Sequence, residues 1–167
     1  MWRKYFGPLA TIVGIDHMPR CKKLESEGTF VRIGSQEDQA FLQNVIDEFG
    51  VPDVVLDDGS HQPGPTNAAF EFLYPLMRSR SIYIVEDLHT AYMPEFGGSL
   101  ENQSTFINRT KALIDKMHES YTNGAISGDK ISSQTLSIHV YDSIIALHKG
   151  SIKNKKTSER GEFLSDF

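Results

Sequence analysis

Short apolar runs and helix-like segments alternate along the first half of the chain, and this alternation constrains the fold more than any other feature. The apolar runs read as buried strands and lie at residues 11–15, 30–33, 53–57 and 81–85. Between them, residues 39–49 and 66–77 carry apolar side chains at helical spacing. Strands that alternate with helices in this way form right-handed βαβ units. The sequence therefore predicts an α/β fold with a mostly parallel sheet.

The C-terminal part follows a different pattern. A predicted helix at residues 104–121 precedes two predicted strands, at residues 135–141 and 143–148. Only the turn at Asp142 separates these strands, and such a short connection requires antiparallel pairing. We therefore expect the sheet to end in an antiparallel hairpin.

Size and composition favour one globular unit. The chain has 167 residues, of which 39% are hydrophobic, enough for the core of a single domain. We expect this domain to span residues 1–149. Residues 150–167 are rich in lysine and other polar residues, and we interpret them as a flexible, solvated tail rather than a binding patch.

Charge and residue usage exclude several classes of partner. The net charge is -5, and lysine and arginine are scattered except near the C-terminus, so nucleic acid is not an expected partner. No run approaches the roughly 20 apolar residues that cross a bilayer, so no membrane partner is expected. Cys21 is the only cysteine, which excludes intramolecular disulfides and cysteine-based metal clusters and fits a reducing cytoplasm.

Polar side chains follow the predicted parallel strands, at the edge where ligands bind in open parallel sheets. They are Asp16, then Gly34, Ser35 and Gln36, then Asp57, Asp58 and His61, then Glu86 and Asp87. Converging carboxylates repel one another unless a cation lies between them, and Mg²⁺ prefers oxygen ligands. The acids after the third and fourth strands therefore suggest a divalent metal site. Alternatively, one acid of each pair faces away and bonds a backbone amide, as we expect for Asp57 at least.

The remaining polar residues at this edge each allow two interpretations. His61 could be a general base or an ordinary loop histidine. Asp16 could accept hydrogen bonds from ribose hydroxyls or cap a turn. Gln36 could reach an adenine edge or face solvent. His89 and Tyr92, with Phe96 and the glycines at 97–98, suit either a substrate-facing lid or a simple connection.

Three strings of residues then resemble a known family. They are VLDDGSH at 55–61, IVEDLHTAY at 84–92 and FGG at 96–98. They resemble class I S-adenosylmethionine-dependent methyltransferases, specifically the metal-dependent sugar O-methyltransferases of macrolide biosynthesis and their cephalosporin hydroxylase-like relatives. The resemblance extends from residue 2 to about residue 149, with WRKYF at 2–6 similar to the helix after the first glycine loop and IHVYDSI at 138–144 similar to the terminal hairpin.

The resemblance implies a Rossmann-like sheet and an enzyme that methylates a hydroxyl of a sugar or related small molecule, with S-adenosylmethionine and Mg²⁺ as cofactors. It implies metal ligation by Asp58 and Asp87 with Glu86 nearby, and proton removal by His61. It also implies a cofactor site that comprises Asp16, Gly34, Ser35, Gln36 and Asp57, and a lid with His89 and Tyr92.

One part of the family pattern has no counterpart. In that family a first strand and a glycine-rich loop precede the residue that matches Met1, and that strand lies between the strands at 11–15 and 53–57. We therefore expect an N-terminally truncated domain with two exposed strand edges, which would favour homo-oligomers. Two alternatives remain: a metal-dependent hydrolase or hydroxylase-like enzyme, and a degenerate remnant of the fold without catalytic activity.

Overall fold

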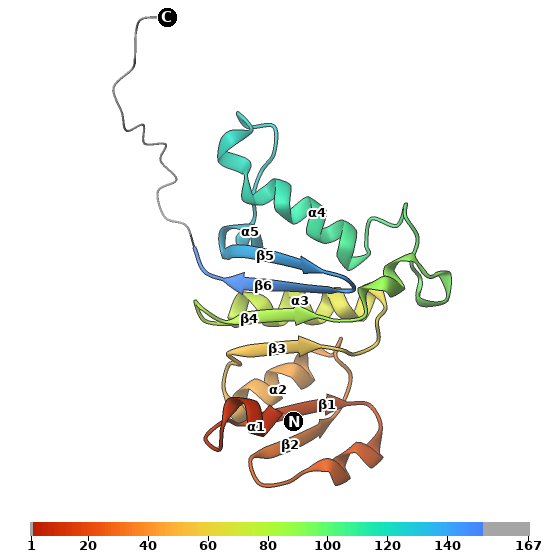
Figure 1. Ribbon diagram of the computed structural model, residues 1–167, viewed down its shortest axis with the longest axis vertical. Coiled ribbons are helices and arrows are strands. Elements are labelled where there is room, and N and C mark those ends of the chain that lie inside the picture. The colour runs from red at the N-terminus through yellow and green to blue at the C-terminus, as the bar shows by residue number, and fades with distance from the viewer. Residues whose placement is uncertain (1, 152–167) are drawn as a thin grey trace, which may run out of the picture.

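The computed structural model describes residues 2–151, and its strands form two groups (Figure 1). The first group is a parallel pair of β1 (Ile12–Asp16) and β2 (Thr29–Ile33). The second is a four-stranded sheet in the order β3 (Val54–Asp57), β4 (Ile82–Val85), β6 (Ile144–Lys149), β5 (Thr135–Tyr141). β3 and β4 are parallel, whereas β6 is antiparallel to both β4 and β5. The predicted parallel strands and C-terminal hairpin are confirmed.

The two groups of strands are neighbours without being paired. In Figure 1 the β1–β2 pair lies beside the β3 edge of the larger sheet. Within the part of the chain that the structure describes, β1 pairs only with β2, and β3 pairs only with β4. This is the place where the family resemblance puts a further strand, and the described residues supply none. One edge of β1 and one of β3 therefore keep backbone groups that no strand of the described chain satisfies.

Local sequence signals explain the bounds of the helices. α2 (Gln39–Phe49) begins after Asp38, whose carboxylate accepts from the amide of Phe41, and stops at Gly50, which has a φ of 87°. α3 (Pro63–Leu76) begins three residues before its predicted start. Its first turn tolerates two prolines because the first helical amides have no intrahelical acceptor.

α4 (Phe106–Met117) is shorter than predicted. The hydroxyl of Thr105 caps its first turn by accepting from the amide of Asn108. The helix ends at Met117, and the remaining predicted residues form a 3-10 turn, η4 (Glu119–Tyr121). The other short elements are α1 (Trp2–Phe6), η1 (Pro19–Leu24), η2 (Leu88–Tyr92), η3 (Pro94–Phe96) and α5 (Lys130–Ser133).

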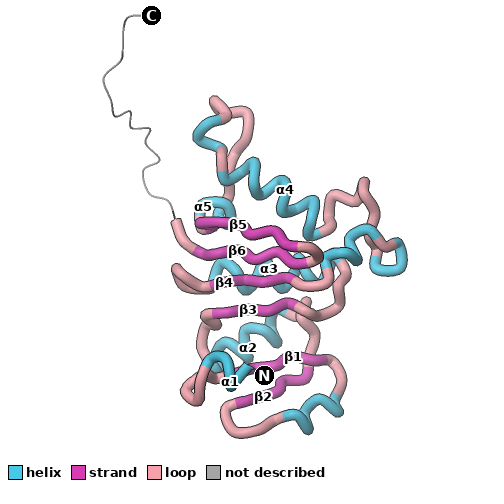
Figure 2. Tube along the Cα trace, viewed as in Figure 1, coloured by secondary structure: helices cyan, strands magenta, loops and turns pink. Residues whose placement is uncertain are grey.

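The core lies where α3 packs against β4 and β6, as the ribbon and tube views show (Figures 1 and 2), and α4 adds Phe106 and Leu113 to the same buried cluster. The ring of Phe70 is its centre, edge-on to Tyr83 at 5.1 Å and to Phe106 at 5.2 Å between centroids. Both edge contacts are favourable for aromatic pairs. The buried Tyr74 hydroxyl is paired with the Thr135 hydroxyl, 3.1 Å away. This core fixes β4, and with it the acidic residues that follow β4.

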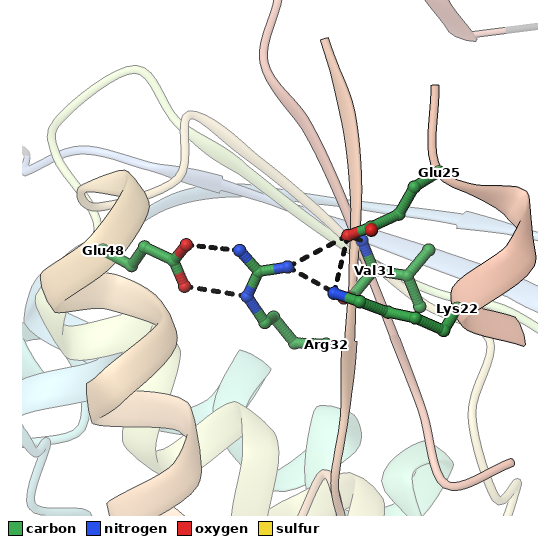
Figure 3. A network of polar contacts seen from close by, with 5 residues as sticks. All are labelled: Lys22, Glu25, Val31, Arg32 and Glu48. Carbon is green, nitrogen blue, oxygen red and sulfur yellow. Dashed lines mark hydrogen bonds and ion pairs between the residues drawn. The ribbon is translucent and has the colours of Figure 1, made fainter. Parts of the chain in front are cut away.

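A charged network attaches the β1–β2 pair to α2 (Figure 3). The guanidinium of Arg32 on β2 donates to both carboxylate oxygens of Glu48 on α2 and, at 3.1 Å, to Glu25. Lys22 donates to the same Glu25 oxygen at 2.8 Å. Hydrogen bonds from Arg32 lower the pKa of Glu48, and Lys22 does the same for Glu25. The network holds β2 in place, and therefore also the loop that carries Gln36.

No helix within residues 2–151 is long and apolar enough to span a membrane. The predicted polar tail falls almost entirely on residues 152–167, which lie outside the described residues.

Candidate metal centre and active site

The parallel pairing of β3 and β4 brings their acidic carboxyl ends together. The ladder ends at the pair Asp57 and Val85, and the amide of Glu86 extends it by donating to the carbonyl of Asp57 at 3.0 Å. Just beyond, ligand atoms of Asp58, His61 and Asp87 all lie within 4.8 Å of one another. The two aspartates are exposed and His61 is half-buried, so the cluster opens to solvent. The structure thus brings together three of the predicted site residues.

The cluster has the donor set of a hard divalent cation. It offers two carboxylates and one imidazole, and among the described residues no lysine or arginine forms an ion pair with either aspartate. Two carboxylates with room for several waters is how proteins commonly bind Mg²⁺. The residues present therefore fit the predicted metal. Glu86, the third predicted acidic ligand, is outside the cluster and lines a cavity of about 20 Å³ beside His61.

Two residues of the cluster have an unusual backbone conformation. His61 has a φ of 58° and Asp87 a φ of 54°, both in the left-handed region. Residues with a Cβ pay roughly 1–3 kcal/mol to occupy sparsely populated regions, which are common at active sites. The hydroxyl of Thr90 contacts the backbone carbonyls of both, at 3.1 Å and 2.7 Å.

Asp57 and its neighbour Asp58 have different surroundings, since Asp58 is exposed. Asp57 is buried, and its carboxylate accepts from the Tyr83 hydroxyl and from the Gln36 amide, each at 3.1 Å. Burial raises the pKa of Asp57, opposed by these hydrogen bonds. Its side chain thus links the start of the β3 loop to Gln36 and Tyr83 through hydrogen bonds. Its predicted contact with the cofactor stays a prediction.

Gln36 connects the two groups of strands. Its Nε2 donates to Asp57, and its Oε1 accepts from the amide of Ser60 at 2.8 Å. A Cβ at Gly59 would lie 1.9 Å from that same Oε1, so glycine is required there while Gln36 stays in place. Sequence reasoning considered Gln36 only as an adenine contact or a solvent-facing residue, and this bridge was missed. No local pattern signals it, because the partners are more than 20 residues apart.

Asp16 and Gly34 lie together at the ends of β1 and β2, where the amide of Gly34 donates to the carbonyl of Asp16 at 3.0 Å. The Asp16 carboxylate accepts from the amide of Met18 at 2.7 Å and from the thiol of Cys21 at 3.2 Å. These hydrogen bonds lower the pKa of Asp16. Its turn-capping interpretation is therefore realised, and its ribose contact stays a prediction.

Of the two predicted lid residues, His89 lies beside the cluster. The Nδ1 atom of His89 is 2.7 Å from the hydroxyl of Ser143 and 3.9 Å from the carboxylate of Asp87. Tyr92 is half-exposed, and the ring of Phe96 lies 6.3 Å from that of His61. The contact to Ser143, in the hairpin turn, was also missed, because nothing in the sequence places that turn next to η2.

Comparison with known proteins gives the chain a family, although no family model matches it. The 8-demethyl-8-(2-methoxy-alpha-L-rhamnosyl)-tetracenomycin-C 3'-O-methyltransferase of Streptomyces olivaceus is 37% identical over 90% of this chain and 39% of its own length. Among solved structures, the MycE methyltransferase of the mycinamycin biosynthetic pathway, in complex with Mg, SAH and mycinamycin VI, is 28% identical. It superposes with a TM-score of 0.80 over 94% of this chain and 41% of its own. The chain belongs to the class I S-adenosylmethionine-dependent methyltransferases.

A second relative is also named as an O-methyltransferase. The mycinamicin VI 2''-O-methyltransferase of Micromonospora griseorubida is 32% identical over 90% of this chain and 38% of its own length. The family resemblance and the Rossmann-like fold predicted from the sequence are therefore confirmed. The chain spans 39% of the tetracenomycin relative and 41% of the MycE chain.

Proposed function

We propose that this methyltransferase-family chain carries the metal-binding side of an S-adenosylmethionine-dependent, Mg²⁺-assisted O-methyltransferase. The acceptor is a hydroxyl of a sugar or related small molecule. The observation that carries the proposal is the cluster of Asp58, His61 and Asp87 at the carboxyl edge of β3 and β4. The relatives support it, since they are named as O-methyltransferases, several of them for a sugar position, and a MycE structure holds Mg and SAH.

The chemistry is an in-line displacement. The bond between acceptor oxygen and methyl carbon forms as the bond between that carbon and the sulfonium sulfur breaks, and the hydroxyl proton must leave. A divalent ion at the cluster would polarise the hydroxyl and lower its pKa. Most of the remaining rate enhancement in such a reaction comes from alignment of the two reactants.

We assign each predicted site residue a role in this reaction. Asp58 and Asp87 hold the ion, with Glu86 nearby. His61 takes the hydroxyl proton at Nε2, the atom that lies 3.8 Å from the Asp87 carboxylate. Asp16 binds the cofactor ribose, and Gly34, Ser35, Gln36 and Asp57 complete the cofactor side. His89 and Tyr92 face the acceptor from the η2 segment.

The proposal also covers the domain bounds, the location and the self-association of the chain. We infer one domain that extends to Lys149, a cytoplasmic location consistent with a single cysteine, and self-association through the open strand edges.

Metal binding is the most direct test. Mn²⁺ substitutes for Mg²⁺ at oxygen-ligand sites and can be titrated calorimetrically or by its spin resonance signal. We expect the chain to bind Mn²⁺, Mg²⁺ to compete, and Asp58→Asn to weaken binding by about 10-fold or more, because one of two charged ligands is lost. Asp142→Asn, an acid at the hairpin turn outside the cluster, is the control. An Asp58→Asn variant that binds Mn²⁺ like the unaltered chain would contradict the proposal.

The transfer reaction is tested separately. A sugar acceptor incubated with S-adenosylmethionine and Mg²⁺ should gain one methyl group by mass, with S-adenosylhomocysteine as the second product. A product that forms equally well without the methyl donor would point to a hydrolase or hydroxylase-like reaction instead.

A further inference from the structure

We propose that Thr90 is a positioning residue that sets the distance between Asp87 and His61 through its buried hydroxyl. The inference rests on the proposed function, because it assigns these two residues to the metal and to the acceptor proton. Thr90 itself would contact neither the metal nor the acceptor. It acts through the backbone of the two residues that do.

The hydroxyl of Thr90 lies between two loops. Its Oγ1 donates to the carbonyl of Asp87 at 2.7 Å and shares the proton with the carbonyl of His61 at 3.1 Å. The amide of Thr90 also donates to the carbonyl of Asp87, at 3.1 Å. Thr90 is only 5% exposed, so water does not readily replace these bonds. One side chain thus holds both left-handed residues of the cluster.

Among residues 2–151, no second hydrogen bond joins the two loops. The β3–β4 ladder ends at the bond from Glu86 to Asp57, at the start of both loops. Beyond it, within residues 2–151, the Thr90 hydroxyl provides the hydrogen bond that joins the loop at 58–62 to the segment at 86–92. Without it, the two loops keep only their separate supports, from Gln36 to Ser60 on one side and from Ser143 to Leu88 and His89 on the other.

The segment at 86–92 is itself held from the other side. A Cβ added at Gly98 would lie 2.4 Å from the carbonyl of Thr90 and 2.5 Å from that of Ala91. The chain after η3 therefore packs directly onto the backbone of Thr90. Because η2 is held there, the hydrogen bond from the Thr90 hydroxyl also holds the backbone of His61 in place.

Metal sites are sensitive to such support. Mg²⁺ demands near-octahedral geometry with short bonds, so the carboxylate of Asp87 would have to be held firmly in place to ligate it. Residues that orient metal ligands through hydrogen bonds typically change metal affinity by about 10- to 100-fold when they are mutated. A hydroxyl that holds the backbone of a ligand belongs to this group.

The test uses the full chain and Mn²⁺ as the probe. Thr90→Val keeps the shape of the side chain and removes the hydroxyl, whereas Thr90→Ser keeps the hydroxyl. The matched control is Thr110→Val: Thr110 is equally buried, and its hydroxyl donates to the carbonyl of Phe106 at 2.8 Å inside α4, away from the cluster. If Thr90→Val does not fold, Thr90→Ala and Thr110→Ala form the same comparison with smaller side chains.

We expect Thr90→Val to bind Mn²⁺ about 10-fold more weakly, and Thr90→Ser and Thr110→Val to bind within about 2-fold of the unaltered chain. A general loss of stability would not produce rescue by serine together with an unaffected Thr110→Val. Equal Mn²⁺ affinity in Thr90→Val and the unaltered chain would overturn the positioning role and leave the metal site intact. An unaltered chain that does not bind Mn²⁺ would overturn both the proposed function and this inference.

Discussion

The imidazole of His61 reaches across from the β3 loop to within 3.8 Å of the carboxylate of Asp87 on the β4 loop. At this distance the two groups are not directly hydrogen-bonded, and they face the same open space. A base and a metal ligand arranged in this way can act on one substrate hydroxyl. The arrangement also allows His61 to be a ligand, and the two roles predict different outcomes.

His61→Gln should separate these roles. If His61 is the base, the variant loses about 10²- to 10⁴-fold in methyl-transfer rate, the usual contribution of a positioned base. Its Mn²⁺ affinity should stay within about 2-fold, because Asp58 and Asp87 remain. Steady-state kinetics and Mn²⁺ titration of the same preparation measure both. A parallel loss of Mn²⁺ affinity would show that His61 ligates the metal.

Gly59→Ala should destabilise the chain. The new Cβ would lie 1.9 Å from Gln36 Oε1, so the bridge between the β2 and β3 loops must break or move. We expect a loss of about 1–3 kcal/mol in the free energy of unfolding, measured in urea. Gly64→Ala in the first turn of α3 is the control, since a Cβ there meets nothing within 4 Å. A similar small effect for both variants would mean that Gln36 yields at little cost.

Lys149 should make stability depend on pH in the alkaline range. It is 6% exposed, and burial together with the nearby Lys130 lowers its pKa to about 8 from an ordinary 10.5. Between pH 8 and 10.5 the folded chain therefore holds fewer protons than the unfolded chain, so stability rises with pH. At neutral pH the charged form costs on the order of 3 kcal/mol.

The variant Lys149→Met removes this titration. We expect the unfolding free energy of the unaltered chain to rise from pH 7 to pH 10 relative to that of Lys149→Met. Urea denaturation at a series of pH values measures it. A difference that does not change over this range would show that Lys149 keeps an ordinary pKa in the folded chain.

Hydrogen exchange should reveal the unpaired strand edges. Amides of β1 and β3 that point away from β2 and β4 have no strand partner in the described chain, whereas β4 is bonded on both sides. We expect those amides to exchange at least about 10-fold faster than the amides of β4, as resolved by NMR. Uniform slow exchange across β3 and β4 would mean that another segment, or a second copy, covers the edge.

Most of the fold could be predicted from the sequence because its signals are local. The bounds of α2 match, since Asp38 and Gly50 mark its ends, and every predicted strand is present within a residue or two. The errors fall where local signals conflict. The sequence assigns the prolines at 63 and 65 to a loop, but they lie in the first turn of α3. The helix predicted to reach residue 121 ends at Met117 and is followed by a 3-10 turn.

The site could be predicted only in part. Sheet topology predicts that the acids after β3 and β4 lie together, and the family resemblance singles out Asp58 and Asp87, which the structure brings into one cluster. The supporting contacts of Gln36, Thr90 and Ser143 join loops that the sequence does not place next to one another. Each depends on a single polar atom at the right distance, and no periodicity or motif encodes that.

The Gln36 bridge also makes the two halves of the site thermodynamically dependent on each other. Gln36 belongs to the loop proposed to meet adenine, and its side-chain Oε1 accepts from the amide of Ser60, two residues beyond Asp58. A ligand that stiffens either loop lowers the entropic cost of ordering the other, and such an effect is reciprocal. The methyl donor and the cation would then each tighten the binding of the other by the same factor, without touching.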